Sequence, residues 1–121
     1  MSCTWQDLRA CSIAQAQGVT EAEHRSAISR GYYACFHRAI PWAEGRGYRF
    51  DSNSGTSHSD VWSKFRGAGI SAQAVYNKQR VAKKWRERAD YHLTTTISPQ
   101  DTRDALSIFD ELHDSLAAVR A

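Results

Sequence analysis

Apolar residues recur at helical spacing along most of this chain, and no segment has the strict alternation of a half-buried strand. The pattern therefore predicts an all-α protein. Four main helices and one short helix are expected, and the short helix is the third in chain order. Their predicted extents are from Thr4 to near Gly18, from Thr20 to Pro41, 59–66, 71–92, and from Ser98 onward.

Three of the predicted helices begin at capping residues. Thr20 and Glu23 form a capping box, in which the hydroxyl and the carboxylate satisfy backbone donors of the first turn. The other two starts are Thr4 with Asp7, and Ser98 with Pro99 and Asp101. Proline at the first helical position and a carboxylate near the positive end of the dipole both favour a helix there.

The apolar positions also predict which face of each helix is buried. In the short helix the inward residues are expected to be Val61, Trp62 and Phe65. In the fourth helix the expected stripe is Ala74, Val81, Ala82, Trp85, Ala89 and Leu93, with Arg80, Lys83, Lys84 and Glu87 opposite. In the last helix it is Ala105, Phe109, Leu112 and Leu116. In the second helix a strip of small residues, Ala27, Gly31 and Ala34, would let another helix approach closely.

Pro41 is expected to bend or end the second helix, because it lacks an N–H and its ring clashes with the carbonyl of His37. Residues 44–57 are rich in Gly, Ser, Asn and Arg, without apolar periodicity, and predict a flexible loop. The expected architecture is a single domain over residues 1–121. It is an up-and-down bundle of four main helices plus a short additional helix.

Composition narrows the class of protein without identifying it. A formal net charge of +3 is too small to imply nucleic acid by itself, but twelve of the sixteen cations are arginine. Guanidinium groups bind phosphate through two prongs, which ammonium groups cannot do. Three cysteines without a Cys-x-x-Cys pair argue against a disulfide framework. A cytoplasmic protein is expected, and no apolar segment approaches the length of a membrane span.

Two arginine–histidine pairs lie on predicted helices and are the candidates for chemistry. Arg30, Tyr33 and His37 share one face of the second helix and would line a cleft or a contact surface. The alternative is that Tyr33 packs in the core while Arg30 and His37 make ordinary hydrogen bonds. A cation beside an imidazole suits phosphate chemistry, because imidazole titrates near neutral pH.

The second pair, Arg86 and His92, lies near the end of the fourth helix. The two residues flank the predicted apolar stripe and would meet at one phosphate only across a cleft, such as a symmetric dimer supplies. Arg88 shares a face with His92. The alternative is an ordinary surface ion pair between Arg86 and Asp90, four residues apart.

Other chemistries lack the sequence patterns that they require. The histidines are scattered without a His-x-x-x-His pair, so no metal site is expected, and no cofactor is expected either. No phosphate-binding glycine loop follows a strand, and no Gly-x-Ser-x-Gly elbow is present. The basic face that contains Arg80 and Lys83 is either a solvated helix side or a nucleic-acid contact.

Three segments resemble the HEPN family of small helical domains, in the order in which that family has them. They are Ser26 to His37, which contains Ser-Arg-x-Tyr-Tyr-Ala; Ser57 to Val61, with Phe65; and Arg86-x-x-Ala-Asp-Tyr, which ends at Tyr91. The resemblance covers most of the chain. It implies a helical bundle that forms a homodimer.

The resemblance also implies an activity. Many HEPN proteins are metal-independent endoribonucleases, often toxins of toxin–antitoxin or phage-defence systems, with a neighbour-encoded antitoxin such as a nucleotidyltransferase. Carried over to this chain, the family signature makes Arg86 and His92 catalytic. His92 would move the proton, and Arg86 would hold the phosphoryl oxygens.

The resemblance further assigns supporting roles to Asp90, Tyr91 and Arg88. The sequence departs from the family pattern directly after the arginine. Catalytic members usually carry Asn, Asp or His there, and this chain has Glu87. Two alternatives to a ribonuclease therefore stay open: a binding module that recognises RNA, a nucleotide or a partner protein, and a structural subunit that pairs with a neighbour-encoded protein.

Overall fold

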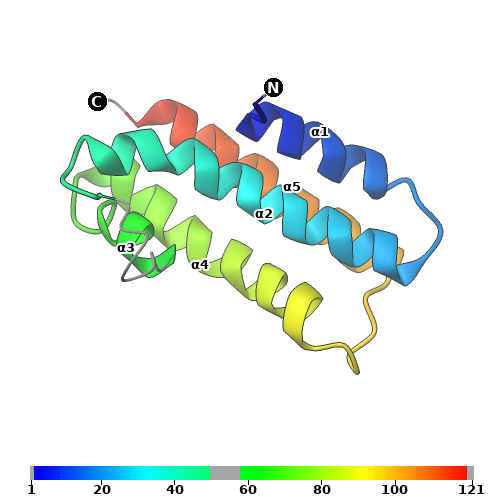
Figure 1. Ribbon diagram of the computed structural model, residues 1–121. Helices are drawn as coiled ribbons and strands as arrows, with labels where there is room; N and C mark the ends of the chain where they lie inside the picture. Colours follow the sequence, from blue (N-terminus) through cyan, green and yellow to red (C-terminus); the bar gives the residue numbers. More distant parts are fainter. Residues whose placement is uncertain (1, 50–57, 120–121) are drawn as a thin grey trace.

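The chain folds into a bundle of helices, with no strand among residues 2–49 and 58–119, which the computed structural model describes (Figure 1). The helices are α1 (Trp5–Gln15), α2 (Glu21–Glu44), α3 (His58–Ser63), α4 (Ile70–Tyr91) and α5 (Pro99–Ala118). The all-α prediction is confirmed, and the five elements match the four main helices and one short helix expected from the sequence.

The central element is α2, which packs against all four of the other helices. Figure 1 shows α1 along one side of α2 and α4 along the other, with α5 behind and α3 beside one end of α4. Side chains of α1 and α5 also contact each other, as in the Arg9–Asp110 ion pair at 3.0 Å. In the described residues, no helix is long and apolar enough to cross a membrane.

All three capping signals form as the sequence predicts. Thr4, Thr20 and Ser98 each accept a hydrogen bond from the backbone N–H three residues later, and the acidic side chain there binds back to the cap. The hydrogen bond that the backbone N–H of Ser98 donates is the main reason why the pKa of the Asp101 carboxyl is lowered. Each box stabilises its helix start by about 1 kcal/mol.

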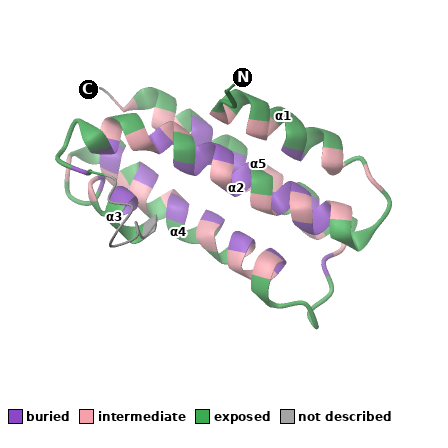
Figure 2. Cartoon of the chain, in the orientation of Figure 1, coloured by how far each residue is buried: buried purple, intermediate pink, exposed green. Residues whose placement is uncertain are grey.

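The core runs along the length of α2 (Figure 2). Gly31 lies where three helices meet: a Cβ built on it would come within 2.6 Å of the Phe109 ring and 2.9 Å of the Ser12 hydroxyl. The neighbouring Ala27 and Ala34 are fully buried. The strip of small residues therefore does allow close approach, and the helices that it admits are α1 and α5.

The predicted stripe of α4 is wrong in part. Ala82 and Ala89 are buried, but Ala74, Val81 and Leu93 are exposed and Trp85 is half-buried. The buried face is instead Ala72, Val75, Gln79, Ala82, Arg86 and Ala89. These positions alternate steps of three and four residues, as expected for a helix packed along its length. Two of these buried positions, Gln79 and Arg86, carry polar side chains. A prediction based on apolar residues alone omits both, so the predicted stripe was displaced and Arg86 was placed beside it.

The prediction at Pro41 is also wrong in part, because α2 continues to Glu44. The helix resumes its hydrogen bonding after the proline, where the Gly45 N–H donates to the Pro41 carbonyl at 3.1 Å. Because Pro41 has no backbone N–H, the carbonyl of His37, four residues earlier, lacks its helical hydrogen bond. His37 is an exposed residue.

The connection after α2 is described only up to Arg49, so the predicted loop at 44–57 lies largely outside the described residues. Tyr48 is buried within the described part. The inward residues predicted for the short helix, Val61, Trp62 and Phe65, are buried as expected. Gly67 and Gly69 follow α3 with positive φ angles of 69° and 107°, which glycine adopts without strain.

A polar cluster is buried between α1, α2 and α5, around His113. The His113 side chain accepts a hydrogen bond at Nδ1 from Arg38 at 3.2 Å, and its Nε2 has no hydrogen-bond partner. The Trp5 ring lies 5.2 Å from the imidazole, and Arg9 pairs with Asp110 at 3.0 Å nearby. Burial, together with the charges of Arg9 and Arg38, lowers the pKa of His113 to about 4.

Candidate nucleic-acid interface

Arg86 is the most unusual side chain among the candidates, because its guanidinium is buried without an anionic partner. The residue is only 6% exposed and faces α2 from the buried side of α4. Its single hydrogen bond runs from Nη1 to the Tyr91 hydroxyl at 3.3 Å, and Nε has no partner. No carboxylate within the described residues forms an ion pair with it.

Two tyrosine rings enclose the guanidinium of Arg86. The Arg86 Cζ atom lies 5.4 Å from the centroid of Tyr32 on α2 and 5.4 Å from that of Tyr91. Each cation–π contact offsets about 1–2 kcal/mol of a desolvation penalty that amounts to several kcal/mol for a buried ion. The rings therefore compensate only part of the burial.

Tyr32 does not supply the missing negative charge. Burial raises the pKa of its phenol to about 12, although the Trp62 hydrogen bond and the Arg86 charge act in the opposite direction. The phenol is neutral at physiological pH, and its oxygen accepts a hydrogen bond from the Trp62 indole N–H at 3.0 Å. Among the described residues, therefore, no negative charge pairs with Arg86.

His92 lies at the same end of α4 as Arg86 but faces a different environment. It is the exposed C-terminal cap of the helix, and its backbone N–H donates to the Arg88 carbonyl at 3.3 Å. No hydrogen bond joins the Arg86 and His92 side chains in the described part of the chain. The fold therefore brings these two residues to the same end of α4 without a hydrogen bond between their side chains.

The supporting residues at this end have separate partners. Asp90 accepts a hydrogen bond from the Ser29 hydroxyl on α2 at 3.3 Å, and it does not form the ion pair with Arg86 that was the alternative expectation. Tyr91 is 69% exposed and covers Arg86 on the solvent side. Arg88 binds the Thr96 carbonyl at 3.2 Å and lies 3.5 Å from Asp101, so it secures the connection to α5.

Arg25, which the sequence reasoning missed, holds the end of α4 in place. Its Nε pairs with Glu21 at 3.1 Å, while its two other nitrogens donate to backbone carbonyls at the end of α4 and just beyond. Those carbonyls belong to Arg88, Ala89, Leu93 and Thr95. Glu21 in turn accepts the Ile97 N–H at 3.0 Å. Nothing in the local sequence signals bonds to carbonyls more than sixty residues away.

The predicted trio on α2 does share an outer face of the helix. Arg30 and His37 are exposed, and Tyr33 is half-buried, with its ring centroid 6.5 Å from that of His37. Tyr33 also packs edge-on against Phe36 at 6.3 Å. Arg30 and His37 are therefore accessible to a ligand on this face of α2.

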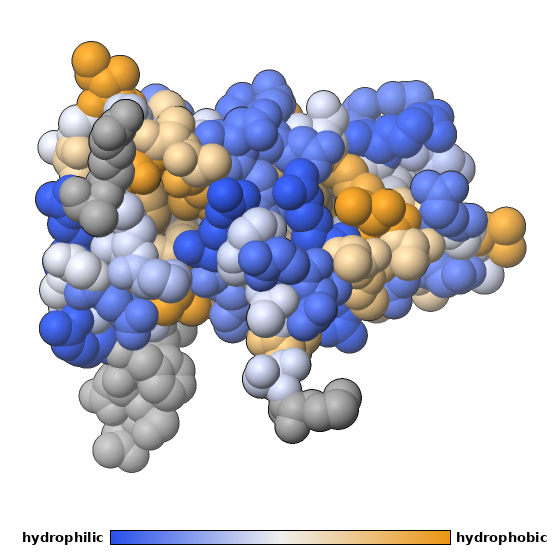
Figure 3. Space-filling model, turned by 90° about the horizontal axis from the view of Figure 1, so that it is seen from above, coloured by the Kyte–Doolittle hydropathy of each residue, from blue (hydrophilic) through white to orange (hydrophobic). Residues whose placement is uncertain are grey.

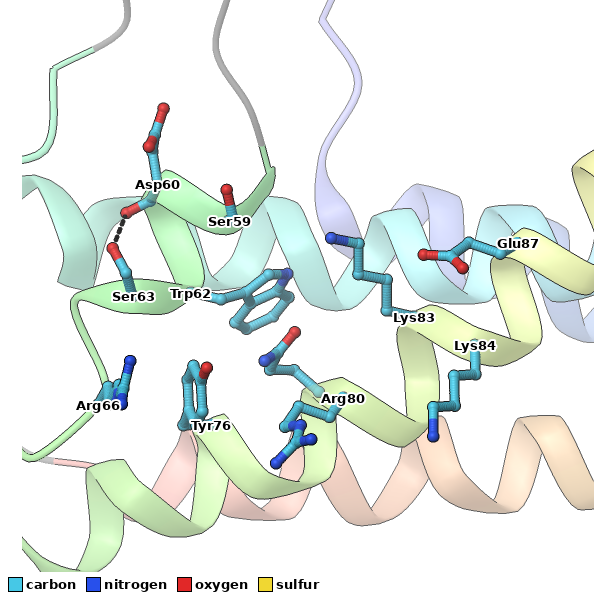
Figure 4. Close-up of a pocket in the computed structure, with 11 residues that line it drawn as sticks. Ser59, Asp60, Trp62, Ser63, Arg66, Tyr76, Arg80, Lys83, Lys84 and Glu87 are labelled. Carbon is cyan, nitrogen blue, oxygen red and sulfur yellow. Dashed lines mark hydrogen bonds between the residues drawn. The ribbon is translucent and has the colours of Figure 1, made fainter.

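A groove opens between α3 and α4, with a volume of about 510 Å³ (Figure 4). Trp62 and Tyr76 form its aromatic part, and two carboxylates line it, those of Asp60 and Glu87. The cations that line it are Arg66, Arg80, Lys83 and Lys84. Of these four, Arg80, Lys83 and Lys84 were predicted from the sequence as a basic face. The contribution of α3 depends on folding and had no sequence signal.

Hydrophilic residues cover most of the face seen from above, and the apolar side chains form small separate groups (Figure 3). Among the described residues, no group of three or more His, Cys, Asp and Glu side chains is placed to hold a metal ion. The exposed cations and the buried Arg86 thus point to an anionic ligand.

Comparison with known proteins identifies no relative: no protein-family profile, curated protein or solved structure matches this chain.

Proposed function

We propose that this protein is a HEPN-like helical module that binds RNA, with Arg86 taking a phosphate group. The observation that carries the proposal is the buried guanidinium without a counter-charge. A phosphate would accept two parallel hydrogen bonds from the planar guanidinium and neutralise it. The sequence resemblance independently gives Arg86 the role of holding phosphoryl oxygens.

Tyr91 is the residue that would admit the phosphate. It is 69% exposed and contacts Arg86 through one long hydrogen bond of 3.3 Å and its ring. A side-chain rotation of Tyr91 would uncover Arg86 and leave Tyr32 as the fixed platform on the other side. Arg25 keeps the helix end in place while this happens, because it binds the backbone and not the moving side chain.

A ribonuclease is the second candidate, favoured by the position of His92 directly after Tyr91. In that reaction the His92 imidazole takes the proton of a ribose 2′-hydroxyl as the oxygen attacks the adjacent phosphorus. The bond from phosphorus to the 5′-oxygen of the next nucleotide breaks, that oxygen takes up a proton from the imidazolium or from water, and a 2′,3′-cyclic phosphate remains. Arg86 stabilises the negative charge that builds on the phosphoryl oxygens. Because no hydrogen bond joins the two side chains among the described residues, this activity would use a second copy of the chain to complete the site, and Tyr91 and Leu93 provide exposed apolar surface for that contact.

Binding and cleavage are separated by two variants and one control. Arg86→Met removes the charge and keeps apolar volume, so RNA affinity should fall at least tenfold. Arg103→Gln is the matched control, because Arg103 is an exposed arginine that binds Gln100 on its own helix. Affinity that is equal in Arg86→Met and Arg103→Gln would refute the proposal.

His92→Ala tests the catalytic candidate in the same preparations. If the protein is a nuclease, this variant retains RNA and leaves it intact, while the wild type shortens it. Expression of the two proteins in cells gives a second readout, because a toxic ribonuclease arrests growth only when His92 is present. Equal cleavage by wild type and His92→Ala would exclude His92 as the proton carrier.

A further inference from the structure

We infer that the groove between α3 and α4 binds a single-stranded stretch of the RNA, about one nucleotide in length, beside the phosphate held by Arg86. The inference rests on the proposed function and adds the path of the strand and its single-stranded form. It is carried by the size of the groove, the row of cations on α4, the aromatic wall, and the contact between that wall and Arg86.

The size of the groove favours an unpaired nucleotide. A volume of about 510 Å³ lies within the range of small-molecule sites. Duplex RNA is recognised by shape and backbone contacts along a broad surface, whereas unstacked bases of a single strand enter hollows. The groove is a hollow bounded by a short helix, which is the form that suits an unpaired base.

The cations are arranged for a polyanion. Arg80, Lys83 and Lys84 follow one another along α4, and Arg80 and Lys84 are separated by about 6 Å of helix rise. Figure 4 shows Lys83 on the same side of α4 as Glu87 in this view, with Arg80 and Lys84 extending on the other. A single phosphate would need these groups to converge on one point, while successive phosphates are matched by cations spread along the groove.

The wall of the groove is aromatic and continues to Arg86. Trp62 and Tyr76 line the groove, and the half-buried Tyr76 offers ring surface to a base that enters it, whereas Trp62 is only 1% exposed. The Trp62 indole N–H donates to the Tyr32 hydroxyl at 3.0 Å, and the Tyr32 ring lies 5.4 Å from the Arg86 guanidinium. The buried Tyr32 therefore contacts both the lining of the groove and Arg86, and in this proposal a strand held at Arg86 continues into the groove.

Two single substitutions test the groove with opposite expected signs. Lys83→Gln should weaken binding of a labelled single-stranded RNA oligonucleotide roughly fivefold and reduce the slope of log affinity against log salt by about 0.7. Glu87→Gln removes a carboxylate that repels phosphate, and should strengthen binding roughly two- to fivefold. Both are measured by fluorescence anisotropy on the full chain.

The control is Lys78→Gln. Lys78 lies on α4 but outside the groove, pairs with Glu111 at 3.5 Å, and loses the same charge when substituted. Its affinity should stay within about twofold of wild type, since it contacts no phosphate. An unlabelled duplex of the same sequence should compete at least tenfold less well than the single strand.

Each outcome bears on a definite part of the inference. If Lys83→Gln binds RNA as well as Lys78→Gln does while Arg86→Met still loses RNA, the groove is not the path of the strand and the proposed function stands. If the duplex competes as well as the single strand, the single-stranded form of the ligand is wrong. If wild type retains no RNA at any salt concentration, the groove and the proposed function fall together. Circular dichroism spectra of the variants confirm that each is folded.

Discussion

Acidification should destabilise the protein through His113, and replacing this residue should remove much of that effect. His113 is 2% exposed and has the positive charges of Arg9 and Arg38 close by. Burial and these charges oppose a proton on the imidazole in the folded state. Because the unfolded chain has no such environment, it takes up a proton below about pH 6.5 that the native protein refuses.

The magnitude follows from the two pKa values. His113 has a pKa of about 4 in the folded protein, against an ordinary 6.5. Its neutral form stabilises the native state fully above about pH 6.5, and this stabilisation falls as the pH drops towards about 4. At about 1.4 kcal/mol per pKa unit, lowering the pH from about 7.5 to about 5 should reduce the free energy of unfolding by about 2 kcal/mol.

Urea unfolding at these two pH values, followed by circular dichroism, measures the effect. His113→Gln cannot titrate, and its amide oxygen can still accept the Arg38 hydrogen bond. Carboxyl groups such as Glu21, whose pKa is lowered by the Ile97 N–H and then by Arg25, also lose stabilisation as the pH falls. Both proteins contain them, so the difference between the two pH responses belongs to His113.

The expected result is a pH response that is about 2 kcal/mol smaller in His113→Gln than in wild type. His37→Gln, which removes an exposed imidazole from α2, should follow the wild type. An equal loss of stability in wild type and His113→Gln would show that His113 is protonated without penalty in the folded state, and would refute the reasoning.

Three further substitutions have definite expected outcomes. Arg25→Met should lower the free energy of unfolding by about 3–5 kcal/mol in urea titrations, because several backbone carbonyls lose their donor and the exposed Glu21 loses its ion pair. Gly31→Ala should cost about 1–3 kcal/mol in the same assay, since the methyl group meets the Phe109 ring and the Ser12 hydroxyl. Arg86→Met should leave the thermal midpoint unchanged or raise it while RNA affinity falls. A drop of more than about 2 kcal/mol in the free energy of unfolding would show that the charged arginine stabilises the fold more than the apolar methionine does.

The helix starts could be predicted from the sequence because their causes are local. A threonine or serine three residues before a carboxylate satisfies the first backbone donors wherever the helix later packs. The three boxes at Thr4, Thr20 and Ser98 need no information from other helices. Pro41 is the local signal that failed, because a proline removes only one hydrogen bond and a long helix can continue past it.

The buried face of α4 could be predicted only in part, because two of its positions carry polar side chains. Gln79 and Arg86 are buried by their contacts with other helices, and apolar counting excludes such residues from a core. The sequence identified Arg86 and His92 as candidates. It could not show that Arg86 is enclosed by Tyr32 and that His92 faces solvent, since both facts depend on how α4 is rotated against α2.

The hydrogen bonds from Arg25 to backbone carbonyls determine which sequence changes the end of α4 can tolerate. Because the guanidinium recognises carbonyl oxygens, which every amino acid possesses, side chains at positions 93–95 are free to vary without loosening the end of α4. What the arrangement does not tolerate is a different route for the backbone. A deletion in this turn would misplace the acceptors, and the neighbourhood of the candidate phosphate site would shift with them.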